Sequence, residues 1–185
     1  MALKSTICKA TLQVVDMDRH YYADHALTIA RHPSETDERM MVRILAFALH
    51  ASSEYPGLQM GRGLSDVDDP DLSERDLTGQ IQTWIEVGQP DERAILKACG
   101  RASRVFVHPY GNGTPIWWKA IASKVERARN AAVIAIDPQA STKLAALADR
   151  AMSLQCTIHD GEVWMRSDDR EVQVPLVTLK AAQEQ

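Results

Sequence analysis

The strongest constraint on the fold of this chain is a repeated alternation of apolar strands and helices between residues 80 and 145. The predicted strands are Gln80–Val87, Val105–His108 and Ala132–Ile136. The predicted helices run from Pro90 or Asp91 to about Ser103, from a start at Thr114-Pro115, and from a start at Asp137-Pro138. Strands joined by helices pair in parallel through right-handed crossovers. We therefore expect an α/β fold built on a mixed sheet with flanking helices.

Both ends of the chain show the two-residue period of half-buried strands. Apolar and polar residues alternate from Thr6 to Val14, and the alternation restarts at Tyr21 after a turn, which predicts an antiparallel hairpin. Near the other end, Asp160-Gly161 suits a two-residue turn. The flanking segments that carry the alternating pattern are Met152–Ile158, Glu162–Arg166 and Glu171–Val174. We expect residues 1–185 to form one domain, with antiparallel strands added from both terminal segments.

A helix is predicted between these regions, with Ser34 as its N-cap and its end near His50. Glu38 lies within about 60° of the stripe formed by Met41, Val42, Leu45 and Leu49. A carboxylate in that position must be paired, protonated or bound to a metal. The alternative is that Glu38 bends back to the helix N-terminus or pairs with an arginine. Residues 52–79 are rich in turns, with a short strand expected around Leu58–Leu64.

The charge balance excludes a general basic coat for nucleic acid. The 185 residues include 21 Lys and Arg against 25 Asp and Glu, for a net charge of −4. The three cysteines are far apart, which indicates reduced thiols and a cytoplasmic protein. No apolar run approaches the roughly 20 residues of a membrane span, so we expect no membrane partner. Glycine-rich nucleotide motifs are also missing, and no organic cofactor is expected.

One acidic pattern points to metal chemistry on phosphates. Pro70-Asp71, a spacer, and an apolar strand ending in Glu86 match the outline of the PD-(D/E)XK nuclease site. That chemistry needs two acidic groups around a divalent cation, usually Mg²⁺, and a lysine near the attacking water. Gly88 stands where the lysine is expected, and Lys97 on the following helix is the candidate replacement. The alternative interpretation is an ordinary acidic loop followed by a strand.

Polar and basic residues next to these acids are candidate nucleic-acid contacts. Arg93, Lys97 and Arg101 follow one another at intervals of four, which predicts one cationic stripe on a helix. Such a stripe either holds phosphates or is a solvated helix face. Gln82 shares a strand face with Glu86 but lies roughly 13 Å away, so it can line a groove without sharing a metal.

Several longer strings in the chain resemble the YaeQ family of Gram-negative bacteria. They are His32-Pro33-Ser34-Glu35-Thr36, Glu38-Arg39-Met40, Arg62-Gly63-Leu64, Trp84-Ile85-Glu86-Val87-Gly88, Pro90-Asp91-Glu92-Arg93 and Ile116-Trp117-Trp118, with the Asp160-Gly161 hairpin. The resemblance implies a variant of the restriction-endonuclease-like, PD-(D/E)XK core. It also implies a candidate site made of Glu38, Asp71, Glu86 and Lys97. Gln82 departs from the acidic residue expected in relatives, which puts catalysis in question.

Two functional hypotheses follow. In the first, the chain is a nuclease-like phosphodiesterase that uses Mg²⁺ or Mn²⁺ held by Asp71 and Glu86. Glu38 is then an auxiliary carboxylate, Lys97 positions water, and Arg93 and Arg101 contact phosphates. In the second, the chain is a catalytically inactive module of the same fold that binds nucleic acid or a transcription-related protein. Missing Mg²⁺ or Mn²⁺ binding would favour the second hypothesis.

Overall fold

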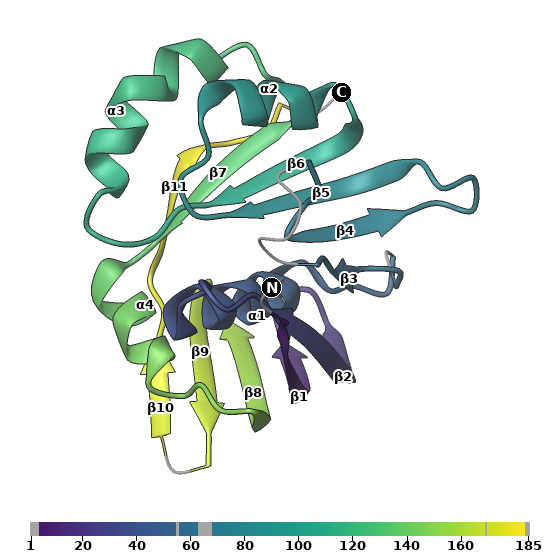
Figure 1. The fold of residues 1–185 in the computed structure, drawn as a ribbon, viewed down its shortest axis with the longest axis vertical. Coiled ribbons are helices and arrows are strands. Elements are labelled where there is room, and N and C mark those ends of the chain that lie inside the picture. The colour runs from purple at the N-terminus through teal and green to yellow at the C-terminus, as the bar shows by residue number, and fades with distance from the viewer. Residues whose placement is uncertain (1–3, 55, 63–67, 169, 184–185) are drawn as a thin grey trace.

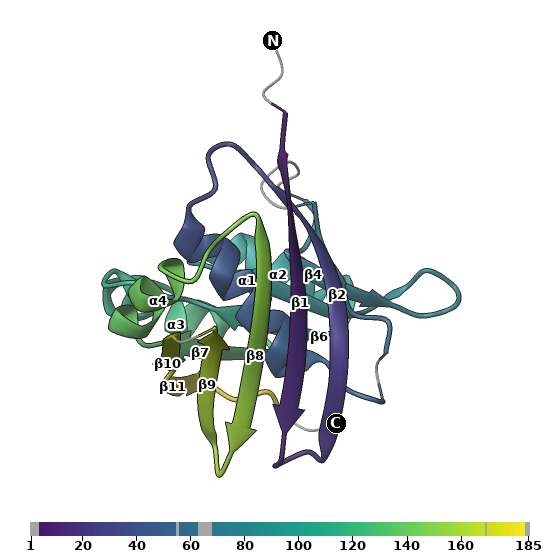
Figure 2. The same cartoon turned by 90° about the horizontal axis from the view of Figure 1, so that it is seen from below.

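The computed structural model describes residues 4–54, 56–62, 68–168 and 170–183, which form two β-sheets and four helices (Figure 1). Sheet A has the strand order β10-β9-β8-β1-β2 (Figure 2). Its strands are β1 (Thr6–Asp16), β2 (Tyr21–Arg31), β8 (Ala151–His159), β9 (Glu162–Ser167) and β10 (Arg170–Gln173). Sheet B has the order β11-β7-β6-β5-β4-β3. Its strands are β3 (Gln59–Met60), β4 (Leu72–Arg75), β5 (Ile81–Val87), β6 (Ala102–His108), β7 (Ala131–Ile136) and β11 (Leu176–Lys180).

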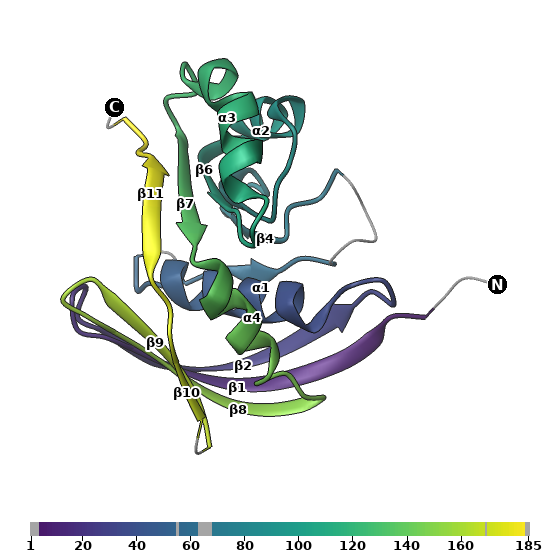
Figure 3. The same ribbon diagram turned by 90° about the vertical axis from the view of Figure 1, so that its left-hand side faces the viewer.

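The helices separate and cover the two sheets. Figure 3 shows α1 (Asp37–His50) between sheet A and sheet B, with α4 (Pro138–Ala145) beside it. The opposite face of sheet B is covered by α2 (Glu92–Cys99) and α3 (Thr114–Val125). The mixed α/β architecture expected from the sequence is therefore confirmed.

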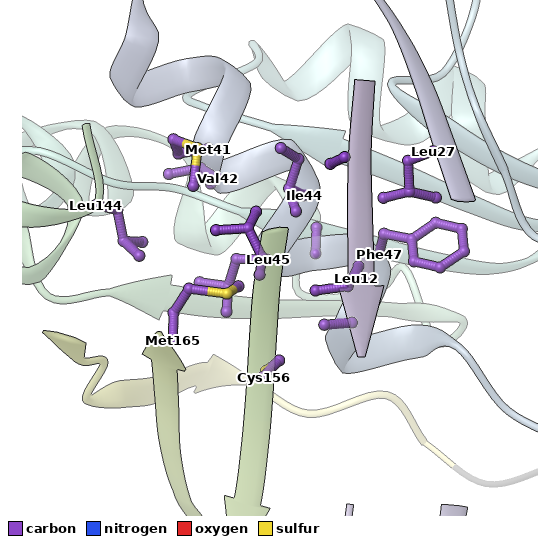
Figure 4. Close-up of a cluster of buried hydrophobic side chains, with 14 of the residues drawn as sticks. Leu12, Leu27, Met41, Val42, Ile44, Leu45, Phe47, Leu144, Cys156 and Met165 are labelled. Carbon is purple, nitrogen blue, oxygen red and sulfur yellow. The ribbon is translucent and has the colours of Figure 1, made fainter. Parts of the chain in front are cut away.

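Helix α1 is the centre of the larger hydrophobic core. Its residues from Met40 to Ala48 are buried, and they pack against the inner faces of both sheets (Figure 4). Such complete burial contributes roughly 1.5–3 kcal/mol for each large apolar side chain. The helix ends at His50 as predicted, but its N-cap is Thr36 rather than Ser34. Thr36 Oγ1 accepts the Arg39 N–H at 3.1 Å, because Pro33 and Ser34 are still in the preceding turn.

The strand pairing follows the predicted periodicities. Strands β5, β6 and β7 are parallel neighbours, as the strand–helix alternation requires. The terminal hairpins β1–β2 and β8–β9 are antiparallel. In addition, β1 and β8 pair in parallel and so join the two ends of the chain in one sheet. This pairing was not anticipated from local patterns.

Several boundaries differ from the prediction. The expected strand around 58–64 is observed as Gln59–Met60, while residues 63 and 64 lie outside the described part of the chain. Strands β4 and β11 were not predicted. Helix α2 ends at Cys99 instead of Ser103, with Gly100 as its C-cap. Thr114 is not the cap of α3, because Gly113 occupies that position. Within the described ranges, no helix is both long and apolar enough to cross a membrane.

Candidate active site

Asp71 is a buried carboxylate placed by the pairing of two strands. It directly precedes β4, whose Leu72 lies opposite Ile85 of the antiparallel strand β5. Asp71, the residue before Leu72, therefore lies beside the C-terminal end of β5. Its Oδ2 accepts a hydrogen bond from the Val87 N–H at 2.7 Å. Its Oδ1 accepts from Arg39 Nη2 at 2.5 Å. Asp71 is 3% exposed, so these two contacts give both of its carboxyl oxygens a hydrogen-bond partner away from bulk water.

Glu86 is the second acidic group of this site. It lies next to the end of β5, and its Oε1 accepts from Trp84 Nε1 at 2.6 Å. Burial and, to a lesser extent, the nearby negative charge of Asp71 together raise the pKa of Glu86 to about 7. The Trp84 hydrogen bond and the Arg39 charge act against this rise. The sequence-predicted pair of Asp71 and Glu86 is thus brought together, with one carboxyl poised to change its protonation near neutral pH.

An ion-pair network beneath the pair was missed by sequence reasoning. Glu35 accepts from Arg39 Nη1 at 2.8 Å and from Arg43 Nη1 at 3.1 Å. Arg43 is fully buried and also donates to the Gly61 carbonyl at 2.9 Å. Arg39 and Arg43 are one helical turn apart on α1, so both guanidinium groups reach Glu35. The spacing of Glu35, Arg39 and Arg43, each four residues apart, was the sequence signal available for this network.

Gly61 and Gly88 fix the backbone around the two acids. A Cβ on Gly61 would lie 2.1 Å from the Pro70 carbonyl oxygen, so only glycine allows this close approach. Gly88 has φ +107, a conformation that favours glycine, and β5 ends one residue before it. The chain therefore turns away from the strand at the position where the nuclease pattern has its lysine.

Tyr110 is a further residue of the site that the sequence did not single out. Its Cε1 atom lies 4.0 Å from where a Gly88 Cβ would be. Burial raises the pKa of the Tyr110 hydroxyl, and the charges of Arg39, Glu38, Glu35 and Asp71 all act on it. Tyr110 therefore lies next to the turn at Gly88, within electrostatic range of the ion-pair network.

Glu38 lies at the α1–α4 contact rather than alone on an apolar stripe. Its Oε1 accepts from Ser141 Oγ of α4 at 2.6 Å. Ser141 is itself fully buried, and its Oγ also lies 3.1 Å from the Pro138 carbonyl oxygen. The partner is neither an arginine nor the helix N-terminus, contrary to the alternative expected from the sequence, because α4 packs against this face of α1.

The structure gives Lys97 and Arg101 other partners than the carboxylate pair. Lys97 is exposed and forms an ion pair with Asp68. Arg101 Nη1 donates to the Asp68 carbonyl at 3.1 Å, and its guanidinium lies 5.1 Å from the Trp84 ring centre. The predicted continuous stripe is wrong for Arg101, because α2 ends at Cys99. Arg93 remains exposed on α2.

Gln82 is held at the other end of β5. Its Nε2 donates to Asp76 Oδ2 at 2.8 Å, and its Oε1 accepts from Ser103 Oγ at 3.1 Å. Both ends of the amide are therefore bonded to the β4–β5 turn and to β6, and not to Glu86. Within the described ranges, His, Cys, Asp and Glu side chains do not form a ready-made cluster of three for a metal.

Comparisons with known proteins agree with this architecture. The YaeQ protein family model matches residues 1–176, which is nearly the whole chain. The chain belongs to the YaeQ family. The YaeQ protein of Escherichia coli strain K12 is 45% identical over 177 residues, covering 95% of this chain and 96% of the relative. The YaeQ protein of Salmonella typhi is 44% identical with the same coverage.

Solved structures of the YaeQ family have the same fold. The crystal structure of YaeQ from Xanthomonas axonopodis pv. citri is 49% identical, with a TM-score of 0.91 over 96% of this chain and 99% of that one. The structure from Pseudomonas syringae is 36% identical, with a TM-score of 0.90 over 96% and 97%. The YaeQ resemblance drawn from short strings is thereby confirmed across almost all of the sequence.

Proposed function

We propose that this chain is a divalent-metal-dependent phosphodiesterase with a restriction-endonuclease-like core that acts on nucleic acid. The observation that carries the proposal is the pair of Asp71 and Glu86, two adjacent carboxyl groups in a site where burial, and then the charge of Asp71, raises the pKa of Glu86 to about 7. Like charges held together in a partly buried site favour a bound cation. The proposal also draws on the PD-(D/E)XK outline of Pro70, Asp71 and Glu86.

The donor chemistry of the pair fits Mg²⁺ or Mn²⁺. Magnesium sites commonly use one or two carboxylates, with waters and substrate phosphates as the other ligands, so a third protein acid is not required. Asp71 and Glu86 are the residues that hold the metal in this proposal. When bound, the metal supplies Lewis acidity toward the scissile phosphate and activates water.

In this proposal, Arg39 supplies the positive charge that the nuclease pattern assigns to a lysine. It is the cation that acts on both acids, since it bonds to Asp71 and lowers the pKa of Glu86. Lys97 is engaged with Asp68. Glu35 positions Arg39, and Arg43 neutralises the second carboxylate oxygen of Glu35. The Arg39 side chain is 14% exposed, so part of it remains accessible from solvent beside the two acids.

A second candidate function rests on the same arginine. Because Arg39 already bonds to Asp71 at 2.5 Å, it supplies positive charge to the acids without a metal. A chain of this kind can bind nucleic acid or a transcription-related protein with no cleavage. This alternative predicts metal-independent binding and no turnover.

Metal binding and cleavage are tested together on the full chain. Mn²⁺ binding is measured by calorimetry, and cleavage is measured on end-labelled DNA and RNA with Mg²⁺, Mn²⁺ or EDTA. We expect one Mn²⁺ site and metal-dependent cleavage, both lost in Glu86→Gln. Asp37→Asn is the matched control, because Asp37 is an exposed acid in the first turn of α1.

The outcomes separate the two candidates. Equal Mn²⁺ binding by the wild-type chain and Glu86→Gln would remove the proposed metal site. Equal cleavage by both would assign the activity to a contaminating nuclease. Nucleic-acid binding without metal or cleavage, measured by fluorescence anisotropy, would establish the non-catalytic alternative in its place.

A further inference from the structure

The layer formed by α2 and α3 has a large excess of basic residues in an otherwise acidic chain. Residues 90–130, which include both helices, contain eight Lys and Arg against three Asp and Glu, whereas the whole chain has a net charge of −4. The two helices lie side by side on the outer face of sheet B (Figure 3), and Lys124 of α3 bonds to Glu92 of α2 at 3.0 Å. A surface with this excess of positive charge attracts polyanions.

Two exposed cations of this layer, Arg93 on α2 and Lys119 on α3, are not used within the protein. In the part of the chain that the structure describes, neither side chain forms an ion pair or a hydrogen bond. The charge of Arg93 acts on Glu92, but that carboxylate is bonded to Lys124. Arg93 and Lys119 therefore remain available to the phosphates of a ligand.

Each helix places an exposed apolar residue three positions from its available cation. Arg93 is followed by Leu96, which is 44% exposed, and Lys119 is preceded by Ile116, which is 79% exposed. Residues three positions apart are neighbours on the surface of a helix. At 100° per residue, each of the four lies about 130–170° from the mean direction of the buried residues of its helix. These four outward residues form what we call the α2–α3 face.

The α2–α3 face lies on the same side of sheet B as the Glu86 side chain. Trp84 packs in a hydrophobic core with Ile95 of α2, and Glu86, two residues later on β5, has the same side of the strand. The starts of the two helices meet just after the end of β5, since Trp117 Nε1 of α3 donates to the Pro90 carbonyl at 2.8 Å. A ligand on the α2–α3 face can therefore extend to the acidic pair.

An exposed apolar side chain beside a cation suits an unpaired strand better than a duplex. The bases of a duplex are stacked on one another, so a protein surface meets phosphates, sugars and base edges. A single strand presents free base faces as well as phosphates, and proteins bind it by combining cations with side chains that pack on the bases. The location of the face next to carboxyl groups proposed to act on phosphodiesters favours nucleic acid over an acidic protein.

We infer that the α2–α3 face binds single-stranded nucleic acid, so that the bound strand extends to the acidic pair. Arg93 and Lys119 bind phosphates, and Leu96 and Ile116 contact bases. The inference rests on the proposed function for its choice of partner, but it concerns binding, which needs no metal.

Fluorescence anisotropy of the full chain in EDTA tests the preference for single strands. The probes are a labelled DNA strand, an RNA strand of the same sequence and the corresponding DNA duplex, with polyglutamate as an unlabelled competitor. We expect at least one single strand to bind about tenfold more tightly than the duplex, because only the strand offers base faces. Duplex binding as tight as that of both strands would overturn the inference. Displacement by polyglutamate as effective as by unlabelled strand would overturn it in favour of an acidic protein.

Substitution of the two cations locates the binding. Arg93→Gln combined with Lys119→Gln should weaken strand binding about tenfold or more. It should also reduce the slope of log affinity against log salt by about 1.4, since roughly 0.7 is lost with each phosphate contact. Lys9→Gln combined with Arg150→Gln removes the same charge from exposed positions of sheet A, and should bind as the wild-type chain does. Equal loss of affinity in both double variants would show that only overall charge matters.

The base contact has a separate readout. Ile116→Ser should reduce the preference for single strand over duplex roughly fivefold and leave the salt slope unchanged, because no phosphate contact is lost. Nuclear magnetic resonance of the wild-type chain checks the location without any substitution. Adding the strand should shift the amide signals of Leu96 and Ile116 and leave that of Lys9 unmoved. Shifts confined to sheet A would overturn the inference.

The outcome for the nuclease proposal is distinguishable from the outcome for this one. Single-strand binding that needs Arg93 and Lys119, without cleavage in Mg²⁺ or Mn²⁺, would remove the nuclease and leave the α2–α3 face established. Cleavage that depends on Glu86, with strand binding unaffected by the Arg93 and Lys119 substitutions, would overturn the present inference and leave the nuclease standing.

Discussion

The Glu86 carboxyl makes stability depend on pH. Its folded pKa of about 7 lies above its ordinary value of 4.5, so the folded chain holds this proton more tightly than the unfolded chain. The stabilising contribution is present below pH 4.5 and is lost as pH rises toward 7. Glu86→Gln should therefore gain about 1–3 kcal/mol in unfolding free energy relative to wild type at pH 8, and little at pH 4.5.

Urea unfolding at pH 4.5 and pH 8 measures this difference. The proposed metal site adds a second expectation, because Mg²⁺ should stabilise the wild-type chain at pH 8 and leave Glu86→Gln unchanged. If the unfolding free energies of wild type and Glu86→Gln differ by the same amount at both pH values, the assigned pKa of Glu86 is contradicted.

Glu35 is a buried counter-ion for the arginines of the site. Its carboxylate forms ion pairs with Arg39, which is also paired with Asp71, and with the fully buried Arg43. Glu35→Gln should cost about 3–5 kcal/mol in unfolding free energy, because a buried guanidinium loses its counter-ion. Urea denaturation measures the loss. Asp37→Asn, which removes an exposed acid two residues away, should cost less than about 1 kcal/mol. Equal losses of unfolding free energy in Glu35→Gln and Asp37→Asn would show that Glu35 is not an essential counter-ion of the buried arginines.

At the scale of elements, the end of β5 determines which side chains can reach the acids. Introducing the lysine of the nuclease pattern by Gly88→Lys should not raise any cleavage activity. It should instead destabilise the fold by about 1–2 kcal/mol, since Gly88 has φ +107. Thermal unfolding and the cleavage assay provide the two readouts. A more active Gly88→Lys variant would mean that position 88 projects into the site after all.

Elements with strong local signals were predictable, and those defined by their neighbours were not. The apolar run of β7 and the Asp137 cap of α4 were recognised from the sequence, and the structure confirms both. Strand β4 has only four residues, and its pairing with β5 rather than its own pattern defines it. Strand β11 is likewise defined by pairing with β7 at the sheet edge.

The candidate site was also predictable only in part. Asp71 and Glu86 were found because the pattern ties a Pro-Asp, through a spacer, to an acid at the end of an apolar strand. The partners of Glu38 and Lys97 were not, because Ser141 is distant in sequence and Asp68 lies in a turn-rich loop. Glu35 lies two residues before α1 begins, so its spacing from Arg39 and Arg43 was an available signal, but its burial beside these two arginines was not predicted.

At the scale of the whole molecule, α1 couples the two sheets. Leu45 is fully buried in the core shared by sheet A and sheet B. Leu45→Ala should lower the unfolding free energy by about 2–5 kcal/mol. Unfolding should remain a single transition, with Trp164 in β9 and Trp84 in β5 losing their native environments together. Single-tryptophan variants followed by fluorescence check this, and two separated midpoints would show that the sheets unfold independently.

The parallel pairing of β1 with β8 has a consequence for synthesis on the ribosome. Lys9 lies opposite Ala151, so one edge of the first hairpin stays without its native neighbour until most of the chain has been translated. During that interval α1 also lacks the β8–β10 part of sheet A that covers it. A nascent chain with such late closure exposes apolar surface and a strand edge, the two features that chaperones protect. The sheet that joins the termini thus makes completion of the fold a late event in the life of each molecule.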